Sequence, residues 1–129
     1  MVDYPIMSLS KELQIGKAGE HLVCCDLIQK GYNAFLADQG LPYDVLVDTD
    51  IGIKRIQVKT TNAEEKDGYH FSLRTAKRAS RLIKMEDMDY IAFVFLPKKR
   101  VQYIPVSVLV TESGCKILSG KCLHLPFEA

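Results

Sequence analysis

The sequence lacks several features that would assign it to a class at once. Its 17 Lys and Arg residues almost balance its 16 Asp and Glu residues, and the formal net charge is only +1. Overall charge therefore does not mark it as a nucleic-acid-binding protein. No apolar run approaches the roughly 20 residues needed to span a bilayer, and the N-terminus has no signal-peptide core. These absences predict a cytoplasmic protein that is not embedded in a membrane.

The four cysteines are unsuitably spaced for metal or redox chemistry. Of the four cysteines, no two form a C-x-x-C pair, which disfavours a zinc knuckle or a thioredoxin-like site. We expect reduced thiols in a cytoplasmic protein. The 129 residues contain no repeat, low-complexity segment or long linker, and a chain of this length buries one core. A single domain spanning residues 1–129 is therefore expected.

The hydrophobic pattern predicts an α/β fold. A helix is expected from Ser10, a good N-cap residue, to Gly31, a good residue to follow a helix. Its inward seam is predicted to comprise Leu13, Gly16, Glu20, Val23 and Leu27. Strands are predicted at 32–37, 41–48, 53–60, 69–74, 89–96 and 101–105, and a second helix at 76–86. The order αβββ-β-α-ββ predicts a central mixed β-sheet flanked by helices, with strand 89–96 central and strand 101–105 at or near an edge.

The turn between the second and third strands determines which polar side chains meet. A loop at 50–51 places Asp44 opposite Gln57. A loop at 51–52 places Asp44 opposite Lys59 instead. Either loop directs all three side chains to one face of the hairpin, whereas a loop of three or five residues does not. A buried lysine beside an aspartate is costly unless the charges pair or serve a site.

Glu20, the carboxylate on the predicted helix seam, adds a second acid to this group. Carboxylate and amide oxygens are the ligands that Mg²⁺ or Mn²⁺ prefers. Such an ion polarises a phosphoryl oxygen and lowers the pKa of an attacking water. The ammonium of Lys59 would orient that water or stabilise charge on the phosphate. The set is suited to hydrolysis of a phosphodiester.

Three short motifs in this order resemble the PD-(D/E)xK nuclease superfamily: Gly19-Glu20, Pro42-Tyr43-Asp44 and Gln57-Val58-Lys59. The resemblance covers roughly residues 10–105. The compact single-domain form is similar to archaeal Holliday-junction resolvases and to intron-encoded homing endonucleases. The resemblance implies a restriction-endonuclease-like core and a metal-dependent endonuclease that acts on duplex or branched DNA.

Carried over residue by residue, the resemblance assigns the catalytic group to Glu20, Asp44, Gln57 and Lys59. Glu20 and Asp44 would hold the metal, with the Gln57 amide oxygen and the Val58 carbonyl as further ligands, and Lys59 would assist the nucleophilic water. The sequence departs from the family pattern in two places. Tyr43 separates the proline from the acid, a spacer that the start of a strand absorbs easily.

Gln57 is the second departure, because it replaces the usual second acid and removes one negative charge. This change predicts weaker metal affinity. It leaves open a nucleic-acid-binding module that no longer cleaves, and also a structural domain that binds a protein partner. The superfamily contains Gln-x-Lys members regarded as active nucleases, which favours catalysis.

Two local excesses of positive charge predict contacts with DNA phosphates. The first lies in the predicted second helix and the second in a turn; they comprise Lys77, Arg78, Arg81 and Lys84, and Lys98, Lys99 and Arg100. Thr60 and Thr61 are subsidiary candidates for hydrogen bonds to phosphate. A specific DNA interface buries ~1,000–2,500 Å² of protein surface, which is generous for so small a chain. A homodimer or higher homo-oligomer is therefore expected.

Each of these residues also has a simpler interpretation. Glu20 could be an ordinary surface residue of a helix, and Asp44 could serve only turn chemistry. Gln57 and Lys59 could form the solvated face of an antiparallel strand. The basic helix could likewise present only a solvated face.

Overall fold

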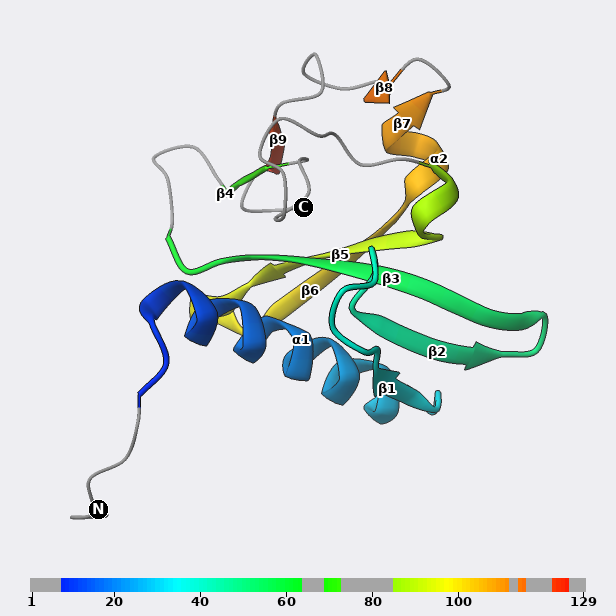
Figure 1. The fold of residues 1–129 in the computed structure, drawn as a ribbon, viewed down its shortest axis with the longest axis horizontal. Helices are drawn as coiled ribbons and strands as arrows, with labels where there is room; N and C mark the ends of the chain where they lie inside the picture. The colour runs from blue at the N-terminus through cyan, green and yellow to red at the C-terminus, as the bar shows by residue number, and fades with distance from the viewer. Residues whose placement is uncertain (1–7, 64–68, 73–84, 112–113, 116–121, 126–129) are drawn as a thin grey trace.

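The computed structural model describes residues 8–63, 69–72, 85–111, 114–115 and 122–125 (Figure 1). The elements are α1 (Lys11–Gln29), β1 (Ala34–Leu36), β2 (Val45–Thr49), β3 (Gly52–Thr61), β4 (Tyr69–Ser72), η1 (Met85–Asp87), β5 (Tyr90–Phe95), η2 (Leu96–Lys98), β6 (Arg100–Pro105), α2 (Val106–Leu109), β7 (Val110–Thr111), β8 (Gly114–Cys115) and β9 (Cys122–Leu125). The predicted helix 76–86 lies mostly outside the described residues, as do its basic residues Lys77, Arg78, Arg81 and Lys84. Among the described helices, none is long and apolar enough to cross a membrane.

Five strands form one mixed sheet in the order β1-β2-β3-β5-β6. The β3–β5 pair is parallel and the other three pairs are antiparallel. Strand β5 is almost wholly buried between β3 and β6, and β6 is an edge strand, as the sequence predicted. The mixed α/β sheet flanked by helices is confirmed. β4 pairs instead with β9 in a separate two-stranded sheet.

Helix α1 begins and ends where the sequence predicted. The Ser10 hydroxyl accepts a hydrogen bond from the N–H of Leu13 at 3.4 Å, and Gly31 follows the helix with φ +96°. The predicted seam was wrong at its first residue, because the Leu13 side chain is 55% exposed. The buried seam consists of Gly19, Val23 and Leu27. Leu13 precedes Gly19 by six residues and so lies about 120° around the helix from it.

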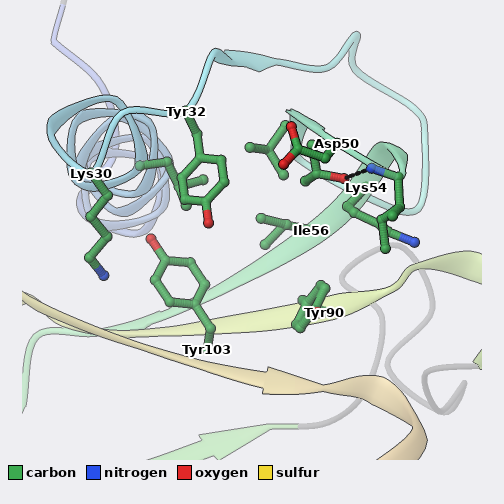
Figure 2. Close-up of a pocket in the computed structure, with 11 residues that line it drawn as sticks. Lys30, Tyr32, Asp50, Lys54, Ile56, Tyr90 and Tyr103 are labelled. Carbon is green, nitrogen blue, oxygen red and sulfur yellow. Dashed lines mark hydrogen bonds between the residues drawn. The ribbon is translucent and has the colours of Figure 1, made fainter.

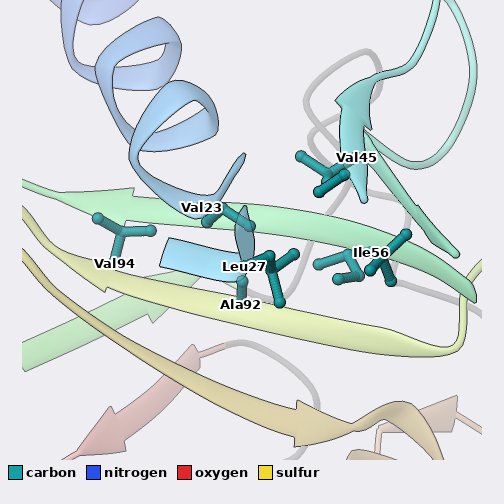
Figure 3. Packing of buried hydrophobic residues seen from close by; sticks show 8 residues of the cluster. Val23, Leu27, Val45, Ile56, Ala92 and Val94 are labelled. Atoms are coloured by element: carbon teal, nitrogen blue, oxygen red, sulfur yellow. The ribbon is translucent and has the colours of Figure 1, made fainter. Parts of the chain in front are cut away.

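Two hydrophobic clusters cover the two faces of the sheet. Val23 and Leu27 of α1 pack on one face against strand residues that include Val45 and Ile56 (Figure 3). On the other face, Phe93 of β5 contacts Phe71 of β4 with ring centroids 4.9 Å apart. Figure 1 shows α1 on one side of the sheet, with α2, β4 and β9 on the other. The sheet therefore has no freely solvated face along its central strands.

The β2–β3 hairpin has a two-residue loop. Thr49 pairs with Gly52, so the loop consists of Asp50 and Ile51, the first of the two predicted alternatives. Gly52 has φ +117°, a conformation that glycine adopts without strain. This loop fixes the ladder of β2 against β3, in which Val45 pairs with Ile56.

Candidate active site

Asp44 lies at a β-bulge where the chain enters β2. Val45 pairs with Ile56, yet the N–H of Asp44 also donates to the Ile56 carbonyl at 2.8 Å. Two residues of the incoming chain therefore face one residue of β3, and such bulges redirect side chains. The expectation that Asp44 stands directly opposite Gln57 was wrong for this reason, although the loop that would have produced it is present.

The bulge directs the Asp44 carboxylate to the edge of β3. Asp44 Oδ2 accepts a hydrogen bond from the backbone N–H of Val58 at 2.8 Å. The carboxylate thus takes the place of a backbone acceptor just outside the first residue of β2. Val58 lies between Gln57 and Lys59, so this hydrogen bond fixes Asp44 beside both side chains.

Glu20 approaches the same place from α1. Glu20 is half-buried. It directly follows Gly19, the residue at which the helix backbone is buried against the sheet. Burial raises the pKa of Glu20, and the negative charge of Asp44 raises it further, whereas Lys17 opposes the shift. The two carboxylates are therefore close enough to repel each other through a partly desolvated environment.

Opposing effects act on the ionisation of Asp44 and Lys59. Burial raises the pKa of the Asp44 carboxyl despite the Val58 N–H and the Lys59 ammonium, both of which lower it. Burial also lowers the pKa of Lys59, against the attraction of Asp44. Both groups are thus held in a site where their charged forms are poorly solvated, which is common at functional sites.

Gln57 contributes an oxygen without a donor. Its Oε1 atom is buried and accepts no hydrogen bond within the described residues. A buried oxygen of this kind costs free energy unless it gains a partner. Among the described residues no three His, Cys, Asp or Glu side chains gather as a metal site. A cation here would therefore need neutral oxygens beside the two carboxylates, and the orphaned Gln57 oxygen and the two mutually repelling acids fit a hard cation.

The second basic cluster lies in the turn between β5 and β6. Lys98, Lys99 and Arg100 are all exposed, and Lys99 adopts φ 51°. Because β5 runs parallel to β3, this turn lies at the end of the sheet toward which β3 runs beyond Lys59. Thr61 lies at that end too, but its hydroxyl is bonded to the backbone of Ala63.

The role predicted for Thr60 was wrong, and Gln102 was not identified from the sequence. The Thr60 hydroxyl is buried on the α1 face of β3 and meets Gly19, so it is not presented to a phosphate. Gln102 of β6 was not predicted as a site residue, and its Oε1 is also buried without a partner in the described part of the chain. Phe93 pairs with both Lys59 and Gln102. The lone amide in an apolar strand was the only sequence signal for Gln102.

A separate groove of about 500 Å³ lies at the C-terminal end of α1 (Figure 2). It is bordered by the end of α1 and the β2–β3 hairpin, and its lining includes Lys30, Tyr32, Asp50, Lys54 and Tyr103. The Tyr103 hydroxyl donates to Asp26 at 2.6 Å, and Lys30 forms an ion pair with the same carboxylate at 3.0 Å. None of the predicted catalytic residues lines this groove.

The pKa of Glu20 predicts a pH-dependent effect of its charge on stability. A carboxyl with a raised pKa binds protons more tightly in the folded state, so stability falls as pH rises through that pKa. Without metal, Glu20→Gln should therefore raise the melting temperature by a few degrees at pH 7.5 and leave it unchanged at pH 3.5. Glu12→Gln, an exposed position in the first turn of α1, serves as the control. Thermal unfolding followed by circular dichroism checks this, and an equal gain at both pH values would contradict it.

Comparison with known structures places the fold in the restriction-endonuclease-like α/β class. The bacterial homing endonuclease I-Ssp6803I is similar in structure, with a TM-score of 0.67 and 21% sequence identity. The similarity covers 91% of this chain and 75% of that chain. Among curated proteins, no sequence matches.

The sequence comparison identifies the family. The PD-(D/E)XK endonuclease family matches residues 10–117. This chain belongs to the PD-(D/E)XK endonucleases, a family of nucleases, as its three motifs indicated.

Proposed function

We propose that this protein is a metal-dependent DNA endonuclease of the homing or Holliday-junction-resolving type, acting in the cytoplasm. The family supports a nuclease. One observation carries the rest of the proposal: the Asp44 carboxylate is fixed on the Val58 N–H and is electrostatically coupled to both Glu20 and Lys59. Two acids and one ammonium from three segments thus share a partly desolvated site.

The proposed metal ligands are all oxygens. The carboxylates of Glu20 and Asp44 and the Gln57 amide oxygen would hold Mg²⁺ or Mn²⁺. In an extended strand the N–H and C=O of one residue point toward the same neighbour, so the Val58 carbonyl is a fourth ligand on the Asp44 side of β3. When bound, the ion would polarise the phosphoryl oxygen and lower the pKa of the attacking water.

Lys59 would act on the phosphate and the water directly. The burial that lowers its pKa also strengthens its electrostatic interactions, because less solvent screens the charge. Its ammonium donates hydrogen bonds to a non-bridging phosphate oxygen, where negative charge grows in the transition state. It also orients the attacking water toward the phosphorus.

We assign the phosphate contacts outside the site to the two basic clusters. The exposed turn at 98–100 would contact the DNA backbone beyond the end of β3. The other cluster, Lys77, Arg78, Arg81 and Lys84, lies outside the described residues and is proposed to extend the contact. A homodimer would present one site to each strand of a two-fold symmetric substrate.

A cleavage panel tests the proposal. Purified protein is incubated with supercoiled plasmid, linear duplex and a four-way junction, each with Mg²⁺, Mn²⁺ or a chelator. Nicking that needs the metal supports the endonuclease. DNA binding without cleavage in every metal condition would indicate a binding module, the alternative that the neutral Gln57 leaves open. Failure to bind any DNA at low salt would indicate a domain that binds a protein partner.

Gln57→Glu should increase affinity for the metal, because it restores a negative charge beside the two carboxylates. We expect Mn²⁺ to bind roughly tenfold more tightly, which corresponds to about 1.4 kcal/mol. Isothermal titration calorimetry measures this. Gln29→Glu, at the exposed end of α1, adds the same charge away from the site and should leave the affinity unchanged. A fall in affinity in Gln57→Glu would show that residue 57 does not face the ion.

A further inference from the structure

Helix α1 approaches β3 most closely at Gly19. A Cβ atom on Gly19 would lie 2.8 Å from Thr60 Cβ and 2.9 Å from Thr60 Cγ2, and nearer still to the Thr60 hydroxyl oxygen. Real side chains essentially never come so close. Gly16, one turn earlier in the same helix, has open space at the same place. The helix can therefore occupy its position only with glycine at residue 19.

The side chains of the buried seam of α1 increase in size toward the C-terminal end of the helix. Gly19, Val23 and Leu27 follow one another at i, i+4 and i+8 on the face against the sheet. Their side chains increase in size from none to four carbon atoms. The smallest residue of the seam, which allows the close contact with Thr60, thus directly precedes Glu20.

Thr60 destabilises the fold at this contact relative to an apolar residue of the same shape. Its hydroxyl is buried and has no hydrogen-bond partner within the described chain, although valine would fill the same space without that cost. Thr60 directly follows Lys59, and Gly19 directly precedes Glu20. The contact thus lies one residue away from a catalytic candidate on each of the two elements.

We propose that Gly19 and Thr60 are positioning residues, and that their contact sets the distance of Glu20 from Asp44. The catalytic consequence rests on the proposed function, whereas the position of Glu20 does not. With alanine at residue 19, α1 must move away from β3 and carry Glu20 with it. Misplacement of a catalytic group by about 1 Å can cost roughly 10²-fold in rate.

Cleavage by matched variants tests the catalytic consequence. Gly19→Ala should lower kcat roughly 10²-fold with little change in KM, whereas Gly16→Ala should cleave like the wild type. Adding Thr60→Ala to Gly19→Ala removes two of the three colliding atoms and should restore most of the lost rate. Thr60→Val keeps the shape and should keep the activity. Full activity in Gly19→Ala, or no recovery in the double variant, would overturn the proposal.

A second measurement needs neither metal nor DNA. In the wild type, Glu20→Gln should raise the melting temperature at pH 7.5, because it removes a charge that is partly desolvated by burial and is also repelled by Asp44. In the Gly19→Ala background, that rise should fall to less than half, because Glu20 has moved away. An equal rise in both backgrounds would overturn the inference even if the protein cuts DNA. If the wild type cuts no DNA, the proposed function fails, and the comparison of the two rises still decides the position of Glu20.

Discussion

Replacing Lys59 by methionine should abolish cleavage and leave DNA binding almost intact. Lys59 is half-buried and lies within electrostatic reach of Asp44, so little solvent would screen its ammonium from the charge that develops on the phosphate. Loss of such an electrostatic contact typically lowers kcat by roughly 10²–10³-fold. Methionine keeps an unbranched apolar side chain and removes the ammonium with its charge and its hydrogen-bond donors. Single-turnover nicking measures the rate, and a gel-shift assay at matched salt measures binding.

Lys54→Met is the matched control for this prediction. Lys54 lies on the same strand but lines the groove at the far end of α1, on the α1 face of the sheet. The substitution removes the same charge, so a general weakening of DNA attraction would affect both variants equally. Cleavage at the wild-type rate in Lys59→Met, or an equal loss in Lys54→Met, would exclude the proposed role of Lys59.

The sequence predicted the hairpin because its determinants are local. A two-residue loop and the alternation of side chains along a strand fix which residues share a face. Thr49 does pair with Gly52, so Gln57 and Lys59 follow each other on the face away from α1. The N-cap at Ser10 and the glycine after α1 were also predicted from the sequence, because each depends on a few neighbouring residues.

The position of the Asp44 side chain could not be predicted from the sequence, because it depends on a β-bulge. The alternation rule assumes an unbroken ladder, and the second hydrogen bond to the Ile56 carbonyl breaks it. The deviation brings Asp44 Oδ2 to the Val58 N–H of β3, within electrostatic reach of Glu20. A regular ladder would have left Asp44 on the far face, away from the helix.

Contacts between distant segments account for the other errors. The seam of α1 was drawn through Leu13 because its spacing fits a helix, and the burial of Gly19 depends on Thr60, which is 41 positions further along the chain. Strand β4 was expected in the main sheet, yet it pairs with β9 near the end of the chain. No local pattern distinguishes one partner strand from another.

Asp44→Asn should stabilise the metal-free protein and at the same time abolish metal-dependent cleavage. The raised pKa of Asp44 already includes the attraction of Lys59 and the Val58 N–H, so the charge on this group is less favourable in the folded state than in the unfolded state. Asparagine removes the charge and keeps an oxygen for the Val58 N–H. The free energy of unfolding should increase at pH 7.5 and not at pH 3, where aspartate is protonated in both states. Loss of a charged metal ligand should lower cleavage roughly 10³-fold, equivalent to about 4 kcal/mol.

Asp44→Ala separates the charge of Asp44 from its hydrogen bond, and Asp48→Asn is the control. Asp44→Ala removes both and leaves the Val58 N–H without its acceptor, so it should be less stable than Asp44→Asn by about 1 kcal/mol. Asp48→Asn changes an exposed acid of β2 that accepts a hydrogen bond from Asn33, and it should change neither stability nor cleavage appreciably. Urea unfolding and nicking assays on the three variants measure both effects. A destabilised Asp44→Asn that still cuts DNA would mean that the carboxylate serves the fold alone, because a metal ligand at a strained site gives the opposite pair of results: greater stability and no activity.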